Sequence, residues 1–284
     1  MISPMSSTDS QNFYPEVLTE LAPKFAQADT LRDQIDGLKD GNPSLWETIV
    51  NRLRTDWTYH SNGIEGSTLT RGETHFFLSE GLTVEGKPFK DFLDAKNHAE
   101  AIDILFEIFT DKHPISESFI KEINSLLLQG VKSTPAINAM GHRTQKPATP
   151  GEYKTLANHV QRLDGSIHYY VEPIHVRSQM EELVRWVNES MQTVHAIHVA
   201  AIAHYNLVRI HPFDDGNGRG ARILMNLILL KGGYFPAVIR LETKRKYLEA
   251  LNQANQGNLE PFISFIADTV IATKQSVLDA LTKK

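Results

Sequence analysis

Residues 194–230 read VHAIHVAAIAHYNLVRI, then HPFDDGNGRGAR, then ILMNLILL. Apolar residues recur at intervals of three and four in residues 194–208 and again in residues 217–230, which is the spacing of a helix that packs on a core. A glycine pair, Gly232 and Gly233, follows the second run and indicates where that helix ends. The stretch therefore predicts two helices joined by a polar loop whose glycine-rich half opens the second helix.

Helical spacing extends along the chain on both sides of this pair. It is found in residues 93–109, 115–128 and 176–191, and in residues 244–281 with one break. Ser116 precedes one of these runs at the position where a helix-capping residue is expected. The spacing therefore predicts an all-α protein.

One segment, residues 140–172, interrupts the helical spacing. Prolines and a glycine come first, and two short runs, residues 156–160 and 167–171, then flank an Asp164-Gly165 turn. This pattern is typical of a β-hairpin. The sequence therefore predicts a helical bundle that carries a small β-hairpin flap.

No internal repeat and no low-complexity tract divides the chain. The polar start, which lacks the features of a signal peptide, predicts a flexible tail over residues 1–20. A first helical region is expected over residues 21–95 and a larger helical domain over residues 96–284.

The composition excludes several classes of protein. With 284 residues, 41% of them hydrophobic, the chain can bury a sizeable core, which excludes a disordered protein. Lys plus Arg number 29 against 34 Asp plus Glu, so the net charge of −5 leaves no basic excess for binding nucleic acid. The longest apolar run, residues 221–230, is too short to enter a membrane as a span. The absence of cysteine excludes disulfides and thiolate metal sites and is compatible with the cytoplasm, which is the expected location.

The loop HPFDDGNGRGAR, residues 211–222, carries groups suited to phosphate chemistry. Gly216 and Gly218 permit positive φ angles, and the free N–H groups and dipole of the helix that follows can bind an anion. Arg219 and Arg222 lie three residues apart on that helix, so both guanidinium groups can reach one triphosphate.

Two further residues of the loop complete a reactive set. Asp215 can hold a divalent ion against phosphate oxygens, with Mg²⁺ as the usual choice, and His211 is the residue that titrates near neutrality. A plain chain reversal would explain a single Asp-Gly or Asn-Gly pair. The convergence of so many groups favours nucleotidyl or phosphoryl transfer, and neither a Walker loop nor a kinase motif is present.

The same twelve residues resemble the signature of Fic-domain proteins: His, any residue, Phe, any residue, Asp or Glu, Gly-Asn-Gly-Arg, two residues and Arg. The resemblance implies the Fic fold, with residues 96–284 as the catalytic domain. It implies a protein adenylyltransferase that transfers AMP from ATP to a Tyr, Ser or Thr hydroxyl. His211 would be the general base and Asp215 the ligand of Mg²⁺, with Mn²⁺ as the other possible metal. The residues implied to bind the nucleotide are Gly216, Asn217, Gly218, Arg219 and Arg222, and by a weaker match Tyr247 and Asn255.

The resemblance also assigns a role to the flap near residues 156–171. In the family this hairpin docks the target protein by main-chain pairing, in the manner of an added strand. Such docking leaves little side-chain code, so the sequence does not name the target. Self-modification is a further expected activity.

A second motif, YHSNGIEG at residues 59–66, resembles the inhibitory helix of Fic proteins through Ser61, Glu65 and Gly66. In that family the glutamate pairs with the second arginine of the signature, here Arg222, and keeps the ATP γ-phosphate out of its productive position. The same glutamate can orient a water that removes AMP from modified targets, so deadenylylation is an alternative function. Taken alone, Ser61 and Glu65 would be a helix cap and a surface carboxylate.

Two more alternatives come from other functional classes. A non-enzymatic adaptor could use the Fic fold for binding, although the complete signature argues against a decayed site. A zinc hydrolase could use His195, His198 and His204, but no HExxH motif and no carboxylate at ligand spacing accompany them. Capping or packing is the favoured interpretation of these three histidines.

Overall fold

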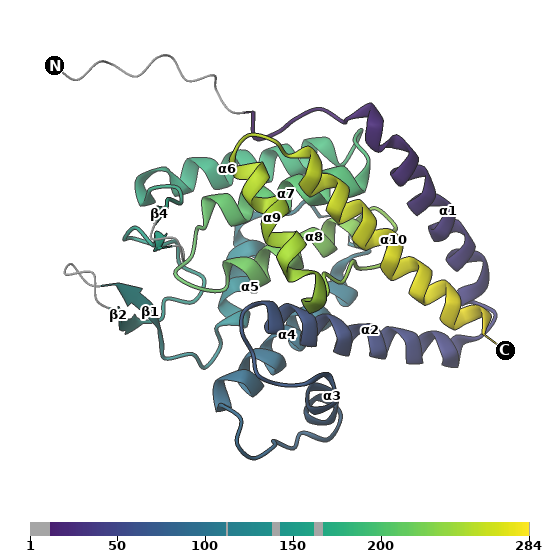
Figure 1. The fold of residues 1–284 in the computed structure, drawn as a ribbon, viewed down its shortest axis with the longest axis horizontal. Helices are drawn as coiled ribbons and strands as arrows, with labels where there is room; N and C mark the ends of the chain where they lie inside the picture. The colour runs from purple at the N-terminus through teal and green to yellow at the C-terminus, as the bar shows by residue number, and fades with distance from the viewer. Residues whose placement is uncertain (1–11, 112, 138–142, 162–166, 284) are drawn as a thin grey trace.

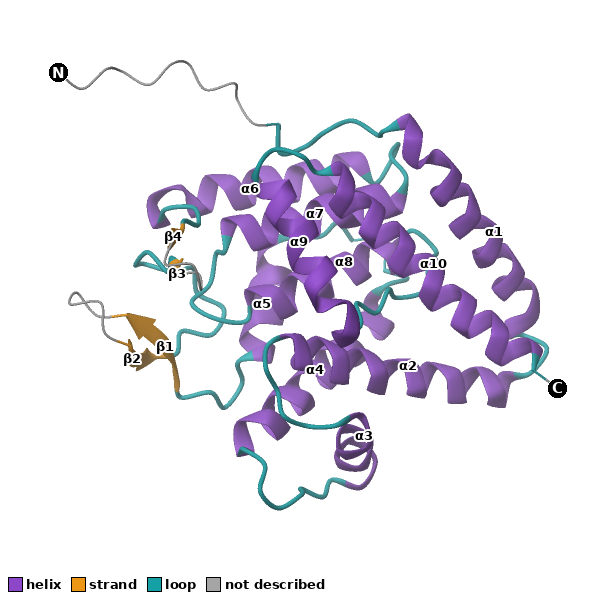
Figure 2. Ribbon diagram, viewed as in Figure 1, coloured by secondary structure: helices purple, strands orange, loops and turns teal. Residues whose placement is uncertain are grey.

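The computed structural model describes residues 12–111, 113–137, 143–161 and 167–283. Helices make up most of this part of the chain, with two short hairpins at one edge of the molecule (Figures 1 and 2). The α-helices are α1 Ala22–Lys39, α2 Pro43–Ile64, α3 Arg71–Glu80, α4 Phe89–Ile108, α5 Glu117–Leu127, α6 Pro173–Ser190, α7 Ala196–Ile210, α8 Asn217–Lys231, α9 Lys244–Asn255 and α10 Glu260–Thr282. The strands are β1 Ser133–Ile137, β2 Arg143–Pro147, β3 Val160–Gln161 and β4 Ile167–His168, and the 3-10 helices are η1 Thr19–Leu21 and η2 Leu241–Thr243.

Helices α7 and α8 form the centre of the molecule. They pack against each other, and twelve of the fifteen residues in each are buried. Both predicted helices of residues 194–230 are therefore confirmed, and their nearly continuous apolar surface explains why other helices surround them. The loop between α7 and α8 is consequently held at a core position from both of its ends.

The N-terminal helices wrap this centre. Helix α1 runs along α10, and α2 packs against α4 (Figure 1). Arg54 of α2 reaches Asp103 of α4 through two hydrogen bonds of 2.5 Å, which fixes the two helices to each other. The last turns of α2 are buried, so this helix brings its C-terminal end against the start of α8.

The predicted fold class, an all-α bundle with a small hairpin flap, is confirmed. Strands β3 and β4 pair antiparallel inside the expected flap, with Val160 opposite His168 and Gln161 opposite Ile167. They are shorter than the predicted runs, and the Asp164-Gly165 turn lies outside the described residues.

A second hairpin was not predicted. Strands β1 and β2 pair antiparallel in a register that sets Ser133 opposite Pro147 and Ile137 opposite Arg143. Their sequences, STPAI and RTQKP, lack the alternation of apolar and polar residues that signals a strand. Among the helices of the described residues, none has both the length and the apolar character needed to cross a membrane.

Candidate active site

The loop between α7 and α8 has a conformation set by two residues with positive φ. His211 ends α7 with φ 52°, and Gly216 precedes α8 with φ 79°. The amide of Asn217 closes the loop, since its Oδ1 accepts from the Phe213 N–H at 2.9 Å and its Nδ2 donates to the Phe213 carbonyl at 2.8 Å. The first turn of α8 is closed by the Gly220 N–H, which donates to the Gly216 carbonyl at 2.8 Å. The N–H groups at residues 217–219 precede that bond, which is where a helix can bind an anion.

The His211 imidazole lies beside an aromatic ring. It stacks on Tyr170, with 3.7 Å between the ring centroids and 20° between the planes. Burial, together with the positive charge of Lys154, lowers the pKa of His211 to about 3, although a hydrogen bond to the Val208 backbone opposes both effects. The imidazole is therefore neutral at physiological pH, which is the form that can accept a proton.

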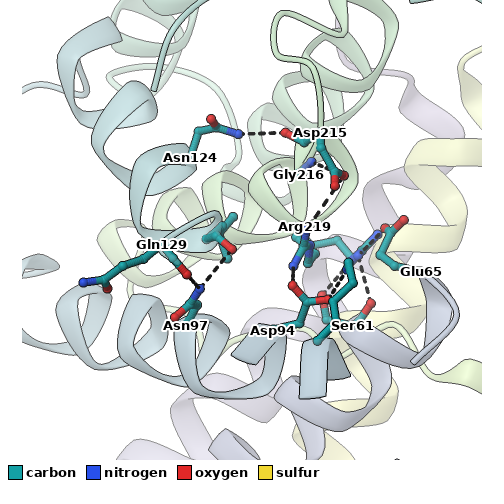
Figure 3. Close-up of polar contacts among 12 residues, drawn as sticks. Ser61, Glu65, Asp94, Asn97, Asn124, Gln129, Asp215, Gly216 and Arg219 are labelled. Atoms are coloured by element: carbon teal, nitrogen blue, oxygen red, sulfur yellow. Dashed lines mark hydrogen bonds and ion pairs between the residues drawn. The ribbon is translucent and has the colours of Figure 1, made fainter. Parts of the chain in front are cut away.

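Arg222 is buried and joins α8 to the end of α2. Its Nε donates to Ser61 Oγ at 2.9 Å, and its Nη2 donates to the Ser61 carbonyl at 3.0 Å and to Glu65 Oε1 at 2.7 Å (Figure 3). Burial by itself would raise the pKa of Glu65, but Arg222, with Arg219 and Lys244, outweighs it and lowers that pKa. Glu65 is therefore an anion at neutral pH, with 45% of its side chain exposed.

Gly218 allows Glu65 to lie close to the start of α8. A Cβ atom placed at residue 218 would overlap the Glu65 carboxylate, so a glycine is needed for this approach. Gly66 has φ 101°, and its N–H bonds to the Gly63 carbonyl at 3.1 Å where α2 ends. The carboxylate of Glu65 thus lies against the N-terminal end of α8.

Arg219 forms a buried ion pair that the sequence did not indicate. Its Nη1 donates to Asp94 Oδ1 of α4 at 2.7 Å, and its Nη2 lies 3.8 Å from Asp215 Oδ1 (Figure 3). Lys90 also pairs with Asp94. The Arg219 guanidinium therefore lies between two carboxylates, and the resemblance that assigns it to phosphate did not include Asp94. Nothing in the helical pattern of residues 93–109 distinguishes this aspartate.

Asp215 has the surroundings of a partial metal ligand. Its Oδ1 accepts from the Gly216 N–H at 2.6 Å, its carbonyl accepts from Asn124 Nδ2 at 2.9 Å, and 31% of its side chain is exposed. No group of three His, Cys, Asp or Glu residues within the described ranges could hold a metal by itself. Mg²⁺ is usually held by one or two carboxylates together with substrate phosphates. One partly exposed carboxylate beside an anion-binding helix end fits that mode.

Comparison with known proteins identifies the domain. The pattern of the Fic/DOC family matches residues 114–229, which include the whole loop between α7 and α8. The chain carries a domain of the Fic/DOC family. Protein adenylyltransferase fic-1 of Caenorhabditis elegans is 33% identical over 258 residues, which are 88% of this chain and 46% of the relative. Protein adenylyltransferase Fic of Nematostella vectensis is 31% identical over 262 residues, covering 89% and 55%. The chain thus spans about half the length of these curated relatives.

Solved structures carry the same fold. A Fic-domain-containing signaling protein from Bacteroides thetaiotaomicron superposes with a TM-score of 0.79 at 28% identity, covering 90% of this chain and 96% of the other. Fic-1 of C. elegans superposes with a TM-score of 0.76 at 29% identity, covering 91% and 72%. The helical arrangement around the Fic signature is therefore shared.

Tyr247 and Asn255, the two weaker nucleotide-binding predictions, lie on α9, which follows the residues matched by the Fic/DOC family. The Tyr247 ring is buried, its hydroxyl is 3.1 Å from His204 Nε2, and the nearby positive charge of Arg222 counteracts the rise in the Tyr247 pKa that burial causes. Asn255 is the last residue of α9 and is half-buried, without a side-chain hydrogen bond to any described residue. The structure thus joins Tyr247 to Arg222 and leaves Asn255 apart from that network.

The three histidines considered for zinc have separate partners. His195 stacks on Phe25 with 4.5 Å between centroids, His198 Nε2 is 3.0 Å from the Pro15 carbonyl, and His204 pairs with Tyr247. They therefore do not share a ligand position.

Several residues that hold the Fic loop were missed in the sequence. Asn124 of α5 bonds to the Asp215 carbonyl and accepts from the Gly151 N–H at 2.9 Å. Asn158 Nδ2 donates to the Phe213 carbonyl at 2.9 Å, and Lys146 pairs with Asp214 at 2.5 Å. Asparagine and lysine are frequent at surfaces, so their spacing carried no signal.

Proposed function

We propose that this chain is a protein adenylyltransferase that transfers AMP from ATP to a Tyr, Ser or Thr hydroxyl of a target protein and is inhibited by Glu65. The observation that carries the proposal is the arrangement at the two ends of one loop, where His211 ends α7 and the Glu65–Arg222 pair lies on the first turns of α8. The curated relatives bearing the name protein adenylyltransferase support the same activity.

The proposed reaction is a displacement at phosphorus. The target hydroxyl oxygen forms a bond to the α-phosphorus of ATP, the bond to the β-phosphate oxygen breaks, and pyrophosphate leaves. His211, neutral because its pKa is lowered to about 3, accepts the hydroxyl proton on a ring nitrogen. The N–H groups of Asn217 and Gly218 at the start of α8 would stabilise the developing phosphate charge, and the Gly216 N–H, which bonds to Asp215 Oδ1 in this structure, would join them when that bond is exchanged.

Charge on the outer phosphates needs cations. Arg222 supplies a guanidinium once Glu65 has left it, and Arg219 lies one turn earlier on the same helix. Mg²⁺, or Mn²⁺, when bound with ATP would neutralise phosphate charge, and Asp215 is the residue that would hold it.

Inhibition follows from the position of Glu65. Its carboxylate accepts a hydrogen bond from Nη2 of Arg222 and lies next to Gly218. An incoming γ-phosphate would therefore meet a negative charge at this position. Ser61 accepts from the same guanidinium at Nε through its hydroxyl and at Nη2 through its carbonyl, so the end of α2 fixes Arg222 in the inhibited arrangement.

The partner is proposed to be a target protein docked along the flap near residues 156–171. The β3–β4 hairpin supports this placement because main-chain pairing needs a strand at the edge of the molecule. Self-modification is the simplest such reaction. We further place the catalytic domain in residues 96–284 and the protein in the cytoplasm, which the absence of cysteine supports.

A second candidate function is removal of AMP from modified targets. The observation that favours it is the exposure of Glu65, whose charged carboxylate reaches solvent beside the start of α8 and can orient a water. Both activities use one site in opposite directions.

Intact-mass measurement after incubation with ATP and Mg²⁺ tests the proposed transfer. Wild type and the Glu65→Gly variant are compared side by side. The double variant, which carries both Glu65→Gly and His211→Ala, is the inactive control. An added AMP mass that appears in Glu65→Gly and is missing in the double variant supports the proposal. Equal, unmodified masses for all three proteins, also in the presence of candidate target proteins, would contradict it.

A further inference from the structure

Lys154 is a buried lysine next to the proposed general base, and no sequence motif assigned it a role. Only 3% of the residue is exposed, and no carboxylate lies within ion-pair distance of its ammonium in the described part of the chain. Its Nζ donates to Asn158 Oδ1 at 2.8 Å and to the Ile210 carbonyl at 3.4 Å. A buried cation without a carboxylate partner is costly, so a functional reason is expected for it.

The contacts of Lys154 surround His211 in the chain. Its side chain bonds to the carbonyl of Ile210, and its main-chain N–H bonds to the Pro212 carbonyl at 2.8 Å. Asn158, which holds the ammonium, also donates to the Phe213 carbonyl. Residues 154–158 therefore hydrogen-bond to the backbone on both sides of His211.

The electrostatic situation of His211 explains why a cation is useful here. His211 follows the last residue of α7, and the C-terminal end of a helix carries partial negative charge that favours a protonated imidazole. A protonated His211 could not accept a proton from the target hydroxyl. An ammonium that binds the last carbonyl of α7 opposes this effect.

The groups that face His211 come from two other segments. Tyr170 stacks on it, His168 and Lys154 lower its pKa, and Asp214 in its own loop is held by Lys146. Burial lowers the pKa of Lys154 to about 8, with Glu172 and Asp214 opposing this. Lys154 is therefore positively charged below pH 8. This range includes the pH at which an ordinary, exposed histidine takes up a proton.

We propose that Lys154 is a positioning residue of the Fic domain, which fixes the backbone around His211 and adds to burial in disfavouring the protonated form of its imidazole. This rests on the proposed function only for the use of His211 as a base. The effect of Lys154 on His211 ionisation is independent of any transfer activity.

Titration of His211 by NMR tests the inference directly. The full chain is compared as wild type, Lys154→Met, Lys154→Gln and Lys154→Arg. Lys146→Met is the matched control, because it removes a lysine that pairs with Asp214 in the loop between α7 and α8. The two neutral variants should raise the His211 midpoint by about one pH unit, a tenfold gain in proton affinity, since a nearby like charge disfavours the protonated form. Lys154→Arg and Lys146→Met should keep the wild-type midpoint.

Circular dichroism at each pH confirms that the compared proteins are folded. If Lys154→Met does not fold, Lys154→Gln decides, because its amide keeps a donor for the Ile210 carbonyl. An unchanged His211 midpoint in a folded neutral variant would overturn the inference. The acid limb of AMP transfer, measured with Glu65→Gly in every variant, should move upward in parallel. Loss of transfer in all variants with a shifted midpoint would contradict the proposed function and leave the role of Lys154 intact.

Discussion

At His211 the side chain is stacked, buried and neutral, and this state defines its expected role. Replacing it in the active background, as Glu65→Gly, His211→Ala, should lower AMP transfer at least ~10²-fold, because the hydroxyl loses its proton acceptor. ATP affinity should change little, since the imidazole serves the hydroxyl. Rates of AMP incorporation and ATP binding by calorimetry measure the two effects. Full transfer by the alanine variant would show that another group is the base.

Glu65 is the residue whose removal should increase activity. Glu65→Gly frees Arg222 for the γ-phosphate and removes a negative charge beside it. A charge-assisted hydrogen bond is worth about 1.5–3 kcal/mol, and partial exposure of Glu65 places the gain near the lower end, so transfer should rise about 10-fold or more. Arg222→Ala should fail to mimic it, because it also removes the phosphate ligand. AMP incorporation in the two variants and in the double variant measures this.

The Glu65 prediction has two contrary outcomes. If Glu65→Gly transfers no more AMP than wild type, Glu65 is an ordinary residue at the end of α2. If only removal of AMP from a modified protein decreases, deadenylylation becomes the leading function.

Asp215 should act through the metal. Asp215→Ala in the Glu65→Gly background should lose transfer and recover part of it when Mg²⁺ or Mn²⁺ is raised, because phosphate oxygens alone bind the ion more weakly. His211→Ala should show no such recovery. A metal titration of the transfer rate for each variant checks this contrast, and identical responses would mean that Asp215 is not a ligand.

At the scale of elements, Asn124 joins α5 to the active-site loop and to the segment before the flap. Asn124→Ala removes both hydrogen bonds, which should lower the free energy of unfolding by about 1–3 kcal/mol and also reduce transfer by the folded protein. Asn188→Ala is the matched control, because Asn188 makes two similar bonds to the Ile115 backbone. Urea unfolding and the transfer rate of each variant separate the two effects. Equal rates in both variants would show that Asn124 has only a structural role.

For the whole molecule, buried histidines predict the dependence of stability on pH. Burial lowers the pKa of His204 and His211 to about 3 and that of His98 well below its usual value. Below pH 6.5 these histidines bind protons in the unfolded chain and stay neutral in the folded protein. The free energy of unfolding should therefore fall as the pH decreases from 6.5 toward 3. Each such histidine contributes up to roughly 1.4 kcal/mol per pH unit in that window.

Thermal unfolding between pH 7.5 and 4.5 measures this dependence. His204→Gln should flatten the curve, because it removes one of the buried titrating groups. The control is His113→Gln, whose side chain is 86% exposed, and its curve should match that of wild type. A melting temperature that stays constant from pH 6.5 to 4.5 would contradict the prediction.

The sequence by itself determined the helices and the position of the reactive loop. Apolar spacing is a local property, so it predicted α7 and α8, and the residues of the Fic signature are neighbours in the chain. The motif at residues 59–66 pointed to Glu65 only through a family resemblance. The inhibitory role of Glu65, the metal role of Asp215 and the nucleotide roles of Tyr247 and Asn255 stay predictions.

Only the tertiary structure decided which distant groups meet the loop. Asp94 reaches Arg219, Asn124 reaches Asp215, and Lys154 reaches the end of α7, across separations of 125, 91 and 56 residues. Each of these residues is of a type that is common on surfaces, and no local spacing marks one whose side chain will be buried. The β1–β2 hairpin was missed for the same reason, since pairing between strands replaces the apolar alternation that its sequence lacks. These contacts come from the packing of helices around α7 and α8, which no single segment encodes.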